Sequence, residues 1–130
     1  MGQGGIRAPV RGSLHYSSAP ADWQPTKAKG FWIKSLYEDS ARGEKTMLMK
    51  LDPGAFAPLH NHPGEFEQIY VLEGTFYDQH KTMGVGDYCC RTPEALHSAG
   101  STEGAVVMVI YTRRDDGELD GLVDRSALTL

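Results

Sequence analysis

The chain has 130 residues, the length of a single domain. Its 13 Lys and Arg residues against 17 Asp and Glu residues give a formal net charge of −4, which argues against binding of nucleic acid through a basic face. The longest apolar run, residues 105–111, is far too short to cross a membrane. We therefore expect a globular protein with no nucleic-acid partner and no membrane partner.

The N-terminal segment, residues 1–22, is rich in Gly, Ser, Ala and Pro and shows no clear periodicity, which predicts a flexible arm. Strand-like patterns begin after it. Residues 31–37 are aromatic and β-branched. Residues 46–51 alternate in polarity, so that Met47 and Met49 share one face of a predicted strand.

Further strands are predicted over residues 68–73, over 75–78 as their continuation beyond Gly74, and over 88–91 and 105–111. Turn signals separate the strands at short intervals, and no long helical period appears. Many short strands predict an all-β sandwich or barrel, and a jelly roll is one of the few ways to bury them.

These patterns divide the chain into three parts. We expect the arm over residues 1–22, one barrel over residues 23–112, and a short polar tail over residues 113–130 that packs on or beside the barrel. The adjacent Cys89 and Cys90 point to opposite faces of a predicted strand, so they make a poor disulfide. Two free thiols and the lack of an N-terminal signal peptide predict a cytoplasmic protein.

Three of the five histidines lie in positions that suit a metal site. His60 and His62 are two residues apart on an extended segment, so they face the same side. Glu67 follows a turn at residues 63–64, and His97 follows a second turn. Three imidazoles and one carboxylate form a site for one divalent ion with open positions, and Fe, Zn, Mn, Ni and Co all suit such ligands.

The other two histidines carry no such expectation. His15 lies in the arm and His80 lies in a polar hairpin tip, so we expect both to be exposed to solvent. A His-x-His pair by itself is also more often a solvent-facing pattern than a metal site. The prediction for the other three therefore depends on the sequence around them.

The spacing of the residues around them resembles the first motif of the cupin family, G-x5-H-x-H-x3–4-E-x6-G. Every element is present at an allowed spacing, on Gly54, His60, His62, Glu67 and Gly74. The second cupin motif, G-x5-P-x-G-x2-H-x3-N, is degraded but keeps its glycine and its metal ligand. Its matching and altered positions are Gly86, Pro93, Glu94, His97 and Ser101.

Segments between Trp23 and Tyr111 are similar to the ChrR-type cupins. This group includes the zinc-binding domain of certain anti-sigma factors and proteins similar to acetylacetone dioxygenase, which uses non-haem iron. The resemblance implies a cupin double-stranded β-helix, a jelly-roll barrel with one metal ion per chain. ChrR-type domains commonly place the glutamate where this chain has Phe66. The spacing to Gly74 selects Glu67 over Glu65 as the ligand.

Three more residues are candidate substrate contacts. Met49 and Phe56 are expected to face the interior, because Phe56 shares the parity of His60 on an unbroken strand. Arg91 either pairs with Asp87 or Glu94 on the surface or clamps a carboxylate substrate. No residue beyond the metal ligands is assigned as a general acid or base, so the catalytic residues stay unassigned.

Two functions are compatible with this reading. In the first, the chain is a small-molecule enzyme, a dioxygenase or isomerase that acts on a small carbonyl compound at an open metal site. In the second, it is a non-catalytic module that senses a metal or ligand, as in the anti-sigma factors. No output module is visible in the sequence, which favours the enzyme.

A homodimer is also predicted. The strand that begins after Glu67 turns Tyr70 and Leu72 to the outer face, and monomers rarely leave such an apolar patch in water. Closed two-fold dimers are the commonest soluble assemblies. The arm, with Trp23 and Trp32, offers material to cover the patch from the same chain or from a partner.

Overall fold

The computed structural model describes residues 11–114, and these contain ten strands and no helix. The prediction of an all-β protein is confirmed. In chain order the strands are β1 Gln24–Pro25, β2 Phe31–Asp39, β3 Glu44–Leu51, β4 Phe56–His60, β5 Glu65–Gly74, β6 Phe76–Tyr77, β7 Thr82–Met83, β8 Tyr88–Arg91, β9 His97–Gly100 and β10 Ala105–Arg113.

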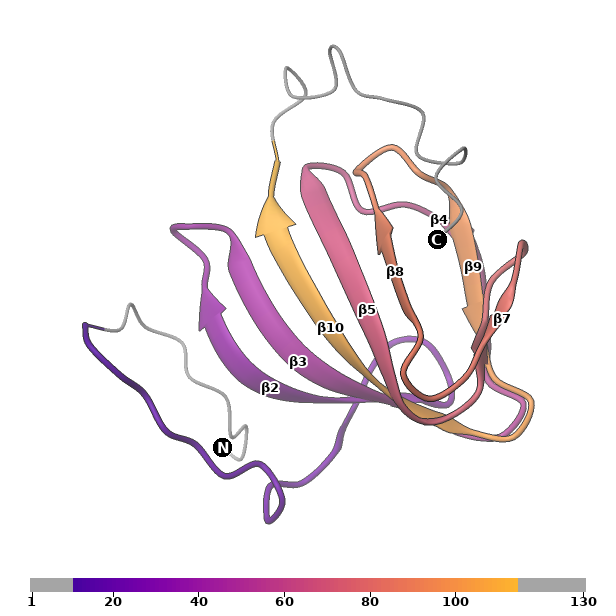
Figure 1. Ribbon diagram of the computed structural model, residues 1–130, viewed down its shortest axis with the longest axis horizontal. Coiled ribbons are helices and arrows are strands. Elements are labelled where there is room, and N and C mark those ends of the chain that lie inside the picture. Colours follow the sequence, from indigo (N-terminus) through magenta and orange to yellow (C-terminus); the bar gives the residue numbers. More distant parts are fainter. Residues whose placement is uncertain (1–10, 115–130) are drawn as a thin grey trace.

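The strands form two antiparallel sheets that face each other as a jelly roll, as predicted (Figure 1). The larger sheet has the order β1-β2-β3-β10-β5-β8 and the smaller one β4-β9-β6-β7. Within the described range, no helix is long and apolar enough to span a membrane.

The core lies between the sheets and follows the alternation of the strands. On β5, Ile69 and Val71 are buried, while Tyr70 between them is 45% exposed. On β10, Val107 and Val109 are fully buried opposite these positions. Because successive side chains point to opposite faces, one apolar face of each long strand builds the core.

The path after β5 differs from the prediction. Residues 75–78 do not continue β5, because the chain crosses to the smaller sheet, where residues 76–77 form β6. The crossing occurs at Gly74, which has a φ of +72°. A Cβ at Gly74 would collide with the carbonyl of Gly104, so only glycine fits this approach of two chain segments.

Strand β9 is absent from the sequence prediction. All four of its residues, His97–Gly100, are buried, so no polar alternation marks the segment. The two cysteines of β8 are free, as expected. Cys89 packs against the core and burial raises the pKa of its thiol to about 11, whereas Cys90 is exposed.

Part of the predicted arm lies against its own barrel. The Lys34 ammonium on β2 donates to the Ser18 carbonyl at 2.9 Å and lies 4.8 Å from the centre of the Trp23 ring. Figure 1 shows this segment beyond β2, away from β5 and β8. Residues 1–10 of the arm and 115–130 of the tail lie outside the described residues.

The outer face of β5 and β8 stays open among the described residues. Tyr70 and Tyr88 are cross-strand neighbours and are 45% and 52% exposed, and Leu72 beside them is 36% exposed. Strand β8 is also the edge of its sheet. The homodimer therefore stays a prediction, with this face as its contact.

We expect the purified protein to show a mass near twice 14.3 kDa in light scattering at micromolar concentration. Leu72→Glu should weaken the dimer by about tenfold or more, because a charge would be buried in the contact. Leu59→Glu is the matched control, since Leu59 is 57% exposed on the other sheet. A mass near 14.3 kDa for the unmodified chain would refute the dimer.

Candidate metal centre

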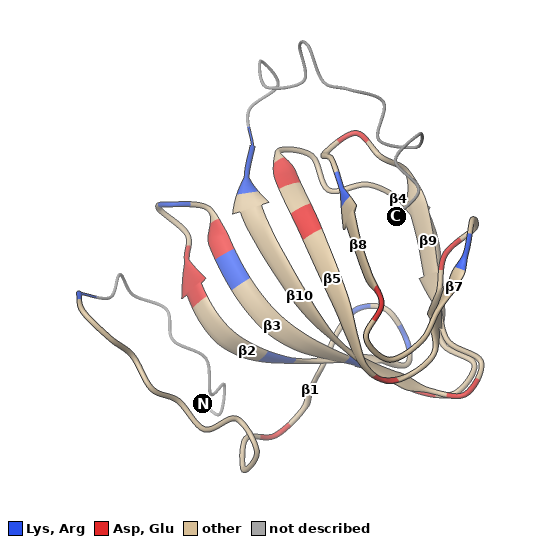
Figure 2. Cartoon of the chain, in the orientation of Figure 1, with Lys and Arg blue, Asp and Glu red and all other residues tan. Residues whose placement is uncertain are grey.

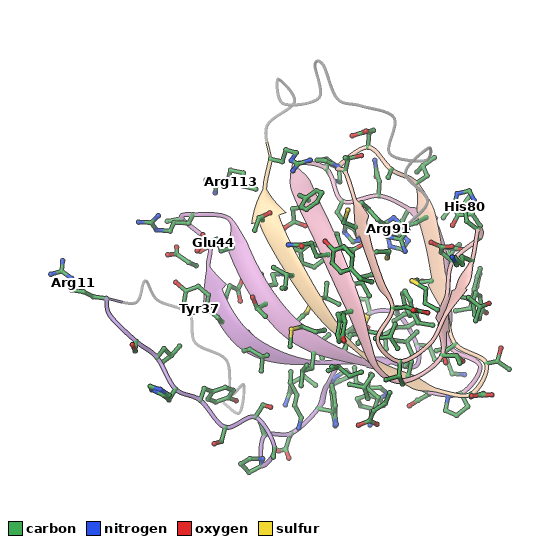
Figure 3. The ribbon with its side chains drawn as sticks, in the orientation of Figure 1. Arg11, Tyr37, Glu44, His80, Arg91 and Arg113 are labelled. Atoms are coloured by element: carbon green, nitrogen blue, oxygen red, sulfur yellow. The ribbon has the colours of Figure 1, made fainter. Side chains whose placement is uncertain are left out.

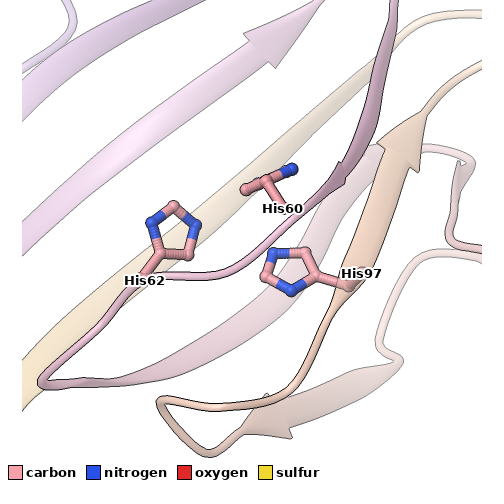
Figure 4. Close-up of side chains that lie close together, drawn as sticks. All are labelled: His60, His62 and His97. Carbon is pink, nitrogen blue, oxygen red and sulfur yellow. The ribbon is translucent and has the colours of Figure 1, made fainter.

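Three histidines meet at one end of the space between the sheets. The possible ligand atoms of His60, His62 and His97 all lie within 4.8 Å of one another. Their ring centres are 4.4 to 5.3 Å apart, and Figure 4 shows the three side chains converging from β4, from the segment after it and from β9. This separation lets three imidazoles hold one ion.

The local structure explains the convergence. His60 ends β4 and lies directly opposite His97 on β9, and opposed residues of antiparallel strands have neighbouring side chains. His62 lies beyond the end of β4, in a turn closed by a hydrogen bond from the Glu65 N–H to the His62 carbonyl. Gly64 in this turn has a φ of +77°, which suits glycine.

Backbone carbonyls orient two of the rings. Nδ1 of His60 lies 2.7 Å from the Pro58 carbonyl oxygen, and Nδ1 of His97 lies 3.1 Å from that of Ala95. A carbonyl oxygen only accepts, so Nδ1 carries the proton in each ring and Nε2 keeps its lone pair. Metal-binding histidines are commonly fixed in this way.

Glu67 brings a buried carboxylate to the same place. Its side chain is 6% exposed, with Oε1 3.5 Å from Nε2 of His97 and Oε2 3.7 Å from Nε2 of His62. Phe66, at the position where ChrR-type domains commonly carry the glutamate, packs its ring under the guanidinium of Arg114 at 4.0 Å and offers no metal-binding atom. The position selected by the spacing to Gly74 is thus the one beside the histidines.

Cross-strand neighbours hold the Glu67 carboxylate. Tyr111 on β10 donates its hydroxyl to Oε2 at 2.7 Å, and Arg91 on β8 lies with Nε 3.2 Å from Oε1. Arg91 also donates from Nη1 to Asp78 at 2.9 Å. Burial raises the pKa of Tyr111 far above its ordinary value, and the carboxylate adds to this, so the phenol stays a donor.

The charges around the site suit metal binding. Burial lowers the pKa of His62 and of His97, although Glu67 opposes the shift in both, so the imidazoles are neutral at neutral pH. Burial raises the pKa of Asp78, but hydrogen bonds from two backbone N–H groups and from Arg91 outweigh it and hold the pKa below its usual value. Neutral imidazoles and ionised carboxylates are the forms that bind metal.

A buried carboxylate oxygen without a hydrogen bond supports this assignment. Glu67 Oε1 and the Arg91 nitrogens Nε and Nη2 are buried without a hydrogen bond. Buried polar atoms nearly always have a partner, and Oε1 lies toward the histidines. The donor set of three ring nitrogens and one carboxylate therefore fits a divalent ion.

The interior is arranged in layers below this end. Tyr111, Glu67 and Arg91 are neighbours in register on β10, β5 and β8, and Figure 2 shows charged positions at the same end of these strands. The next row in from them is Val109, Ile69 and Cys89. The polar row thus lies above apolar rows.

A cavity of about 230 Å³ lies beside the histidines. Both Met49 and Met47 line it, so the interior position expected for Met49 is confirmed. The expectation for Phe56 is wrong, because that side chain is 54% exposed. A shift in the pairing of β4 with β9 between Ala57 and His60 breaks the parity, and Ala57 lines the cavity instead.

The surface pairing predicted for Arg91 is also wrong. Its side chain is 9% exposed and lies between the sheets, where its partners are Glu67 and Asp78 rather than Asp87 or Glu94 (Figure 3). The reason is its register opposite Glu67 on the inner face. The other predicted role, a clamp for a carboxylate substrate, meets a guanidinium that is already paired with the carboxylates of Glu67 and Asp78.

Sequence reasoning missed Tyr111 and Asp78. The sequence signal for Tyr111 was its spacing, because it lies two residues after Val109 and four after Val107 and so places a hydroxyl group on the same inward face of β10. Asp78 had no such signal, since it comes from the turn before β7. His15 and His80 are exposed, as expected, and Figure 3 shows His80 at the periphery.

Comparison with known proteins decides the family. The family model described as "ChrR Cupin-like domain" matches residues 12–114. The chain belongs to this cupin family. A protein named "Oxalate-binding protein" from Thermotoga maritima is 43% identical over 58 residues, which is 42% of this cupin and 48% of the relative. The cupin thus matches about half the length of that relative.

Solved structures share the fold of this cupin. KdgF from a Halomonas species superimposes with a TM-score of 0.70 at 22% identity, over 83% of this chain and 99% of that one. The complex of SigE with the anti-sigma ChrR from Rhodobacter sphaeroides gives a TM-score of 0.59 at 23% identity, over 71% and 50% of the two chains. At these identities the likeness concerns the fold alone.

We expect the purified cupin to bind about one divalent ion per chain. His60→Ala and His97→Ala should each lower the metal affinity by more than about 100-fold. The loss of a residue that only hydrogen-bonds a ligand costs roughly 10–100-fold, and the loss of a ligand itself should cost more. His80→Ala should keep its metal. Elemental analysis by plasma mass spectrometry measures the content, and full occupancy in His97→Ala would exclude that ligand.

Removing the charge of Glu67 tests the fourth ligand. Glu67→Gln should lower metal affinity by about tenfold or more, because the amide oxygen is a weaker ligand than the carboxylate. Glu65→Gln, two residues away on the same strand, should change it little. Competition with a fluorescent chelator gives both affinities, and the opposite ranking would assign the role to Glu65.

Proposed function

We propose that this cupin is a metal-dependent enzyme that acts on a small carbonyl compound, as a dioxygenase or an isomerase. The ion would be held by His60, His62, Glu67 and His97. A bound divalent ion of this type polarises a carbonyl or activates O₂ at its open positions. The observation that carries the proposal is the cavity that adjoins the histidines.

An open site separates this proposal from a structural metal. A structural site leaves no position around the ion for a small molecule, whereas a catalytic site keeps one open. Here the side chain of His62 is 29% exposed, and all three histidines line the cavity. A small molecule can therefore reach the ligand atoms, which a purely structural site does not need.

The residues of the chain supply binding and orientation. The rings of His60 and His97 are fixed by the carbonyls of Pro58 and Ala95, and the Glu67 carboxylate is fixed by Tyr111 and Arg91. The apolar walls exclude water from the reacting end of a substrate, which strengthens electrostatic interactions there. The Tyr111 hydroxyl keeps its proton and donates a hydrogen bond to Glu67 Oε2.

The second candidate is a module that binds a metal or a ligand without turnover. The family is described by its likeness to ChrR, and the structure in which ChrR contacts SigE shares this fold. The same cavity would serve such a module. Turnover separates the two functions, because an enzyme consumes its ligand and a sensing module only binds it. The free thiols of β8 support a reducing, cytoplasmic setting for either function.

The test is an O₂-uptake and product screen on protein loaded separately with Fe(II) and Zn(II). We expect Fe(II)-loaded protein to consume O₂ with a small diketone or hydroxyketone, or either form to isomerise a hydroxyketone. His97→Ala is the control that removes the site, and His80→Ala is the control that keeps it. Saturable binding of these compounds without turnover would overturn the enzyme and leave the sensing module.

A further inference from the structure

The walls of the cavity carry almost no polar chemistry. They are built from the inward rows of β2, β3, β5 and β10, and the main contributors are apolar. These are Ile33, Met47, Met49, Ile69, Val107 and Val109. The polar residues of the wall are those at the histidine end and Thr26, which lies between β1 and β2.

The two hydroxyl groups in the wall already have partners. The Thr26 Oγ1 lies 2.9 Å from the Phe31 carbonyl oxygen and accepts the Ala28 N–H at 3.1 Å. The Tyr111 hydroxyl donates to Glu67. A ligand in the cavity therefore meets imidazole nitrogens and the Glu67 carboxylate at one end and hydrocarbon elsewhere.

No Lys or Arg belongs to the wall formed by the described residues. Arg91 lies behind Glu67 and is held by two carboxylates. Lys45 lies 5.7 Å from the centre of the Tyr111 ring, in the polar row. Lys34 and Lys50 are on the outer face, against the ring of Trp23.

A charged ligand would be costly in such a cavity. Burial of an unpaired carboxylate is strongly unfavourable, and the protein pairs its own buried carboxylate, Glu67, with both Arg91 and Tyr111. A carboxylate away from the histidines would have no such partner. The volume of about 230 Å³ exceeds the roughly 150 Å³ of a dry apolar cavity that admits benzene.

We propose that this cavity binds an uncharged, largely apolar molecule about the size of a six-membered ring, with a single polar end at the histidines, and that it rejects small dicarboxylates. The orientation of the polar end rests on the proposed function. The preference for a neutral body rests on the walls alone. This preference differs from the ligand in the name of the Thermotoga relative, oxalate.

Cyclohexanone and cyclohexanecarboxylate test the proposal, because they share the ring and differ in charge. We expect cyclohexanone to raise the unfolding temperature of the metal-free and metal-loaded protein by a few degrees at saturation. Cyclohexanecarboxylate should bind the metal-free protein at least about tenfold more weakly. Oxalate should give the metal-free protein no stabilisation.

Three variants of β3 locate the binding. Met49→Gln keeps the size of the side chain but adds an amide to the wall, and should weaken cyclohexanone binding about tenfold. Leu48→Gln is the matched control, because Leu48 is also half-buried but faces the other way and should leave binding unchanged. Met49→Leu should retain binding, which excludes a general loss of folding.

The outcomes separate this inference from the proposed function. Cyclohexanone binding without metal binding or turnover would leave the cavity inference standing and remove the enzyme. Equal or tighter binding of cyclohexanecarboxylate or oxalate would overturn the cavity inference, whatever the metal does. Equal effects of Met49→Gln and Leu48→Gln would place the ligand elsewhere and overturn it as well.

Discussion

The structure depends on the compensation of one buried carboxylate. Glu67 is buried on the inner face of the larger sheet, near the start of β5, where an unpaired charge is not tolerated. Arg91 and Tyr111 meet it from the strands on either side, and Asp78 holds Arg91 from the turn between β6 and β7 of the smaller sheet. Loss of one partner of such a buried pair typically costs about 3–5 kcal/mol. The carboxylate therefore couples strand register and the packing of the two sheets.

The same arrangement concentrates the chemistry at one end of the barrel. The row that contains Glu67 is polar, while the row with Ile69 and Val109 is apolar. A strand repeats every two residues, so one polar residue in an inward series sets a polar layer without disturbing the layers beneath it. The histidines lie at this boundary, where donor atoms face hydrocarbon walls.

Catalysis and sensing would use the same geometry. Both need ligand atoms with fixed orientation and a space beside them, which the carbonyls of Pro58 and Ala95 and the cavity provide. The difference lies in what a bound molecule undergoes, and this depends on the ion and the molecule more than on the fold. The uncharged walls of the cavity act at the binding step, before any reaction or signal, because they select which molecules enter in either case.

The sequence by itself determined the strand-rich architecture and indicated the residues of the candidate metal centre, because short-range alternation and the motif from Gly54 to Gly74 are local properties of the chain. Tertiary structure decided the rest. The altered pairing of β4 turned Phe56 outward, and the register of β8 placed Arg91 against Glu67. Pairing between distant strands depends on contacts that no local pattern encodes, so the network around the carboxylate became visible only in the folded protein.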